Sequence, residues 1–190
     1  MSCNNTQTIR NRYTGVLFML LPMVILSLSF NACTRKEDTV SVPVRQGWVS
    51  DYAGVLQPQE NERISATLES YEKETCHQVY VLIIKSLAGE DMTDFSQRTA
   101  RAWNIGQSGI GDGFLVTIAM QEGKIRIETG AAFEWFIQDG TANNLLKEVV
   151  IPLFRQDRIA EGIERGLDEI MAAGRLRPVP DDLRPANCRR

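Results

Sequence analysis

Acidic residues are the part of this sequence whose types and positions could support chemistry. Four of them flank loops or follow strand-like runs, namely Asp51, Asp112, Glu134 and Asp139. Hard cations such as Ca2+ and Mg2+ take oxygen ligands from carboxylates, carbonyls and water, and need no histidine or cysteine. In α/β folds such ligands often come together from separate loops at the strand ends. The four carboxylates therefore predict a divalent-cation site, with Ca2+ or Mg2+ as its cofactor.

These carboxylates also have a purely structural interpretation, which the sequence alone leaves open. Asp51 can cap a turn, Asp139 can cap the helix that follows it, and Glu134 can be a solvated charge. For each residue taken singly, this structural interpretation fits better than a metal ligand.

The residue patterns of familiar phosphatases and hydrolases are absent from the sequence. His77 is its only histidine, and at the start of a predicted strand it is expected to be a surface or cap residue. Cys33 and Cys76 lack the arginine at the sixth following position with which a cysteine phosphatase holds phosphate. No Asp-x-Asp, P-loop or G-x-S-x-G motif occurs. No catalytic residue is assigned, and whether the protein is an enzyme stays open.

Composition indicates one globular domain and excludes one class of partner. The chain has 190 residues, of which 43% are hydrophobic and 24% charged, enough to fill a single core. Met1 to Ala32 holds two arginines and no acid, so the rest of the chain has 19 basic and 24 acidic residues, a net charge of −5. Such a chain lacks the basic face that phosphate backbones need, so nucleic acid is not expected as a partner.

The N-terminal 33 residues have the order of an export signal. Arg10 and Arg12 precede an apolar run from Val16 to Phe30, which Asn31-Ala32-Cys33 follows. A small residue before a cysteine is typical of lipoprotein processing sites. We therefore expect export to the periplasm or cell envelope, with the protein attached to the membrane through a lipid on Cys33. Plain cleavage, or an uncleaved anchor from a run extended to 19 residues, remains an alternative.

The remaining chain divides into a tether, a domain and a tail. Residues 34–46 are polar and aperiodic and predict a tether, residues 47–174 form the domain, and residues 175–190, with three prolines, predict a flexible tail. In an oxidising compartment Cys76 and Cys188 either pair or stay as two thiols, and two thiols are the default for a loose tail.

The pattern of apolar residues predicts an α/β fold. Residues 78–87 form a continuous apolar run, typical of a central strand buried on both faces, and residues 114–120 and 124–129 form a hairpin. Helices are expected at 57–74, 93–103 and 143–150, the last stopped by Pro152, and after a cap at Asp157. Together they predict a compact α/β/α sandwich with a mixed sheet of about four strands.

Several short motifs recur in a fixed order across this domain. They are Asp51-Tyr-Ala53-Gly54, Gln78 opening the central strand, Trp103-Asn-Ile-Gly106, Gly113 opening the hairpin, Arg126-Ile127, Gly130-Ala-Ala-Phe133-Glu134, Asp139, Pro152-Leu-Phe154-Arg155 and Gly162. In this order they resemble the TPM domain, the family of the thylakoid-lumen acid phosphatase and photosystem-repair proteins, with exported bacterial members. The resemblance implies an α/β/α fold, acid phosphatase activity and calcium binding in some members, and interaction or repair roles in others.

Two departures from the family pattern concern the candidate site. Thr75-Cys76-His77 stands where the family usually has Thr-Gly, and Gly111-Asp112-Gly113 stands where it usually has Asp-Asn-Gly. The resemblance implies a membrane-tethered domain that binds a divalent cation and is a weak acid phosphatase, in which the cation would polarise phosphate and activate water. The alternative is a non-enzymatic interaction, assembly or quality-control factor for membrane protein complexes, with a membrane protein as partner.

Overall fold

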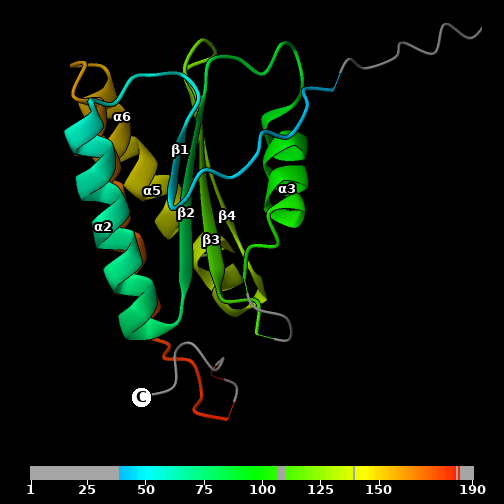
Figure 1. The fold of residues 1–190 in the computed structure, drawn as a ribbon, viewed down its shortest axis with the longest axis vertical. Coiled ribbons are helices and arrows are strands. Elements are labelled where there is room, and N and C mark those ends of the chain that lie inside the picture. The colour runs from blue at the N-terminus through cyan, green and yellow to red at the C-terminus, as the bar shows by residue number, and fades with distance from the viewer. Residues whose placement is uncertain (1–38, 107–109, 139, 183, 185–190) are drawn as a thin grey trace, which may run out of the picture. The chain divides into compact units, whose positions relative to one another are not determined.

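A mixed four-stranded sheet organises the domain (Figure 1). The computed structural model describes residues 39–106, 110–138, 140–182 and 184. The strands lie side by side in chain order and are β1 (Val49–Asp51), β2 (Gln78–Ile84), β3 (Gly113–Ala119) and β4 (Lys124–Thr129). The first three are parallel, and β4 returns antiparallel to β3. The predicted α/β class, mixed sheet and hairpin are confirmed.

Both faces of the central strand are buried, as its uninterrupted apolar run predicts. Val79, Val81 and Ile83 belong to the core on one face of the sheet. The alternate residues Tyr80, Leu82 and Ile84 belong to a second core on the other face. Burying each such side chain stabilises the fold by roughly 1.5–3 kcal/mol, so this strand anchors both layers.

Three long helices cover the two faces of the sheet (Figure 1). They are α2 (Pro58–Thr75), α3 (Met92–Ala102) and α7 (Ile159–Arg175). The start of α2 is fixed by Pro58 in its first turn and by a capping box between Gln57 and Glu60. Asp91 caps α3 by accepting hydrogen bonds from two backbone N–H groups. No helix among the described residues is long and apolar enough to cross a membrane.

The chain between β4 and α7 is more helical than predicted. It contains a 3₁₀ turn at Ala131–Phe133, α4 (Glu134–Gln138), α5 (Thr141–Leu145), a π-helical turn at Leu146–Val150 and α6 (Ile151–Phe154). The expectation that Pro152 ends this helix is wrong. Pro152 lies in the first turn of α6, where a missing N–H is tolerated, so the helical path continues to Phe154. Asp157 does not cap α7 either, because Arg158 occupies that position.

Packed residues extend beyond the predicted domain on both sides. Residues 39–46, here called the N-terminal strap, lie on the α3 face of the sheet. The Trp103 Nε1 donates to the Pro43 carbonyl at 2.8 Å, and the Arg98 guanidinium donates to the Val40 carbonyl at 2.8 Å. Beyond α7, Val179 is buried against Cys76. The strap and residues 176–179 therefore belong to the folded domain.

Candidate functional site

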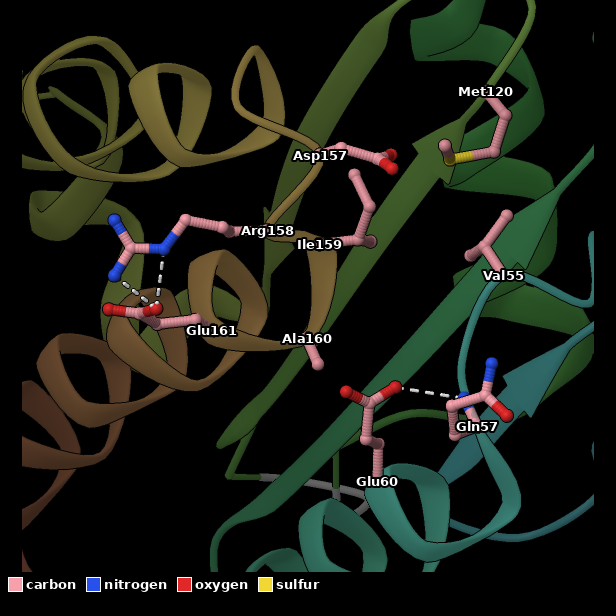
Figure 2. A pocket seen from close by; sticks show the side chains of 9 residues that line it. All are labelled: Val55, Gln57, Glu60, Met120, Asp157, Arg158, Ile159, Ala160 and Glu161. Atoms are coloured by element: carbon pink, nitrogen blue, oxygen red, sulfur yellow. Dashed lines mark hydrogen bonds and ion pairs between the residues drawn. The ribbon is translucent and has the colours of Figure 1, made fainter.

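The carboxyl ends of the parallel strands open into a hollow of about 540 Å³ (Figure 2). It lies where β1 and β3 end and where α2 and α7 begin, and we call it the acidic hollow. Its lining residues are Val55, Gln57, Glu60, Met120, Asp157, Arg158, Ile159, Ala160 and Glu161. In open α/β sheets this edge is where ligands bind, because the connecting loops diverge there.

Charge in the acidic hollow is unevenly compensated. Arg158 is paired with Glu161, whose Oε2 it contacts at 2.8 Å through Nε. Glu60 accepts a hydrogen bond from the Gln57 backbone N–H at 2.8 Å, which is a neutral partner. Asp157 is exposed and has a left-handed backbone with φ of 61°. Among the lining residues, three carboxylates and one guanidinium leave an excess of negative charge on Glu60 and Asp157, although Glu60 also interacts electrostatically with Arg63 outside the hollow.

An adjoining hollow of about 380 Å³ is mainly apolar and is called the apolar hollow. Its lining residues are Ile118, Ala119, Met120, Gly123, Lys124, Ile125, Ile151, Phe154, Arg155 and Ile159. Met120 and Ile159 line both hollows, so the two are adjacent. The only charged residues that line the apolar hollow are the exposed cations Lys124 and Arg155.

Asp51 lies at this edge but is occupied by the backbone. Its Oδ1 accepts from the N–H groups of Ala53 at 3.0 Å and Gly54 at 2.8 Å, and its Oδ2 accepts from Leu56 at 2.9 Å. These bonds shape the turn from β1 into α2. The structure thus places Asp51 in the capping role that was the alternative to a metal ligand.

The predicted ligand Asp112 does not lie beside Asp51. Asp112 precedes β3 and is fully buried, and the register pairs Asp51 with Ile83 but Gly113 with Gln78. Asp51 and Asp112 are therefore at opposite ends of the sheet, six residues or roughly 20 Å apart along β2. Glu134 is exposed at the start of α4, whereas Asp139 lies outside the described residues, as does Cys33. Among the described residues no three His, Cys, Asp or Glu side chains are grouped to hold a metal ion.

His77 is not the surface or cap residue that the sequence suggested. Its side chain is only 2% exposed, and its Nε2 lies 2.9 Å from the Arg177 carbonyl, to which a ring N–H donates. The Nδ1 faces the Asp112 carboxylate at 3.5 Å, and the ring meets Phe133 edge-on. His77 therefore holds the chain after α7 against the amino end of the sheet, away from both hollows.

The Tyr71 side chain of α2 is buried at this end of the sheet, next to Gly174 of α7. Burial raises the pKa of Tyr71 to about 12. A Cβ added to Gly174 would lie 1.8 Å from the Tyr71 hydroxyl, so only glycine permits this approach of α7 to α2.

Cys76 caps α2 in a left-handed conformation and is buried, whereas Cys188 lies outside the described residues.

Sequence reasoning missed the hollows because their residues come from distant segments. The Pro152-Leu-Phe154-Arg155 motif was recognised only as a family feature, and Asp157 only as a helix cap. The available signal was the exposed run Arg155 to Arg158 between two apolar helices. It marks a surface loop but does not reveal that β3 ends beside it.

Comparisons with known proteins agree with this architecture. The TPM domain model matches residues 49–173. The fold is similar to the N-terminal domain of a P. gingivalis protein, with 25% identity, a TM-score of 0.61, and coverage of 66% of this chain and 80% of that one. It is also similar to the BA42 protein of Bizionia argentinensis, with 16% identity, a TM-score of 0.58, and coverage of 70% and 93%.

A third similar structure is the N-terminal domain of a Corynebacterium glutamicum protein, with 18% identity, a TM-score of 0.52, and coverage of 70% of this chain and 84% of that one. No curated protein matches the chain. The family model spans most of the folded domain, from β1 to the last turns of α7. The chain therefore belongs to the TPM domain family.

Proposed function

We propose that this chain is a membrane-tethered interaction module, which binds a segment of a partner protein at the carboxyl end of its sheet. The observation that carries the proposal is the adjacent pair of hollows that share Met120 and Ile159. Their volumes of about 540 and 380 Å³ are each within the range of ligand sites. Neither is lined by a histidine, cysteine or serine that could act as a nucleophile.

A weak acid phosphatase is the other function that family membership suggests, and the geometry supports it less. A phosphate monoester would meet the negative charge of Glu60 and Asp157. Arg158 is already paired with Glu161, and Arg63, which Glu60 faces on α2, is paired with Glu164. The oxygens of Asp51 are bonded to backbone N–H groups. A divalent cation would offset this repulsion, so activity is to be assayed with and without Ca2+ and Mg2+.

Membrane attachment rests on the N-terminal sequence. The arginines, the apolar run and the Ala32-Cys33 junction stand in the order that lipoprotein processing requires. Metabolic labelling with a fatty-acid analogue tests this. We expect label on the parent and none on Cys33→Ser, and an unprocessed Cys33→Ser protein that keeps its label would contradict the lipid site.

The interaction itself is tested by a photocrosslinking amino acid in intact cells. We place it at exposed Arg155, on the rim of the apolar hollow, and as a matched control at exposed Ser70, in the second half of α2. We expect one discrete adduct, mapped to a membrane protein, from position 155 and none from position 70. Absence of that adduct, together with phosphate ester hydrolysis that a chelator abolishes, would favour the enzyme instead.

A further inference from the structure

We infer that the two hollows recognise an extended peptide that places a lysine or arginine in the acidic hollow and an apolar side chain in the apolar hollow. We also infer that this peptide belongs to a membrane protein, just outside the bilayer. The inference rests on the proposed function and names the chemistry of its partner.

The acidic hollow matches an amphipathic cation. Figure 2 shows Glu60 and Asp157 bordering the same open space, with the apolar side chains of Val55, Met120 and Ile159 beside it. Lysine and arginine carry apolar stems that pack on such surfaces while the charged end meets the carboxylates. Anionic lipid headgroups are disfavoured by the same negative charge.

The apolar hollow has the opposite preference. Isoleucines from β3, β4 and α6 line it with Phe154, and no carboxylate does. The Phe154 ring packs closely against Gly162 of α7, since a Cβ added to Gly162 would lie 2.7 Å from the ring. A pre-formed apolar wall accepts an aliphatic or aromatic side chain with little reordering. Its exposed cations, Lys124 and Arg155, disfavour a second basic residue at this position.

The adjacency of the hollows determines the form of the ligand. The acidic and the apolar hollow meet at the shared residues Met120 and Ile159, and we call the pair the groove. Side chains on one side of an extended chain recur every second residue, about 7 Å apart. We therefore expect the basic and the apolar side chain of the partner to be separated by one or three residues.

The strap gives the location of this partner. Its Val40 N–H donates to Glu90 Oε2 at 2.8 Å, in the loop that follows β2 at the carboxyl end of the sheet. The strap therefore begins at the carboxyl end of the sheet (Figure 1). The groove lies at the same end. A chain attached to the membrane at Cys33 has seven further residues to reach Val40, which span at most about 25 Å. Membrane proteins carry aromatic side chains at both membrane interfaces, and a lysine or arginine near the end of a membrane helix extends its charged end to the interface.

The test measures peptide binding to the full chain in lipid nanodiscs by fluorescence anisotropy. The probe is a labelled peptide with lysine and phenylalanine separated by one residue, and a second probe separates them by three. Matched peptides replace lysine by glutamate or phenylalanine by serine. Glu60→Gln keeps the capping box, and Asp157→Asn keeps a residue that tolerates the left-handed backbone. Glu62→Gln with Asp168→Asn removes the same charge from exposed positions outside the groove.

We expect the lysine peptide to bind with salt-dependent affinity, about tenfold more weakly to Glu60→Gln/Asp157→Asn and unchanged to the control pair. Either replacement in the peptide is expected to weaken binding. Equal binding of the lysine and glutamate peptides, or no effect of the groove variants, would overturn the inferred partner chemistry. The position-155 adduct formed in cells would then still support the interaction, whereas loss of that adduct would remove the proposed function itself.

Discussion

The two ends of the sheet use acidic residues in opposite ways. At the amino end, Asp112 and His77 are buried, and the chain after α7 is fastened over them by the Arg177 carbonyl. At the carboxyl end, Glu60 and Asp157 border an open hollow. Arg158 is the one cation among the residues that line this hollow, and it is paired with Glu161. Buried polar groups must be satisfied within the protein, so they fix structure, whereas exposed charge is available to a ligand. This contrast predicts that variants separate into those that unfold the domain and those that change binding.

The largest effect is expected at the closed amino end. Gly174→Ala places a methyl group 1.8 Å from the Tyr71 hydroxyl, so α7 or the tyrosine must move. We expect a loss of about 3 kcal/mol in the free energy of unfolding, measured by urea denaturation. Tyr71→Phe in the same chain removes that hydroxyl and should restore part of the loss. A double variant no more stable than Gly174→Ala would show that this contact is not the cause.

The next effect is a pH dependence at the same end. Burial raises the pKa of Tyr71 to about 12, above the value near 10 of an unfolded chain. The folded state then holds the phenolic proton more tightly, so this stabilisation is fully present below pH 10 and is lost as pH rises toward 12. The expected loss is at most about 2–3 kcal/mol. Urea denaturation from pH 9 to 12 should show a shallower decline for Tyr71→Phe, and equal declines would contradict the assignment.

A smaller effect is expected from Asp51, which tests the cation proposal directly. Asp51→Ala removes the acceptor for three backbone N–H groups and should cost about 1–2 kcal/mol. Asp51→Asn keeps one acceptor oxygen and should cost less. The melting temperatures of parent and variants are compared with and without millimolar Ca2+. A rise in the parent that Asp51→Asn abolishes would make this carboxylate a ligand.

Local sequence patterns predicted those elements that form through interactions between residues close together in the sequence. The run of β2, the hairpin and the starts of α2 and α3 follow from apolar periodicity and capping residues, which act within a few positions. The three residues of β1 gave too short a pattern to be recognised as a strand. The strap was missed for another reason, because its backbone is held by side chains such as Arg98 and Trp103 that lie far along the sequence.

The site depended on information that no local pattern contains. Asp51 and Asp112 both flank predicted strands, but which end of the sheet each occupies follows from strand direction and order. His77 is buried because Phe133 and the segment after α7 cover it, and both come from later parts of the chain. The capping alternative for Asp51 did not need this information, since its hydrogen-bond partners lie within five residues.

The smallest effect on stability is expected at the groove, where it separates the two ends of the sheet most clearly. Glu60→Gln/Asp157→Asn preserves the capping box and the left-handed residue, and it removes two carboxylate charges that make no ion pair with another lining residue. We therefore expect the free energy of unfolding to change by less than about 0.5 kcal/mol, in either direction. The measurement is urea denaturation beside Glu62→Gln/Asp168→Asn. A loss comparable to that of Gly174→Ala would mean that the groove carboxylates hold the fold together, and the contrast between an open binding end and a closed structural end would then fail.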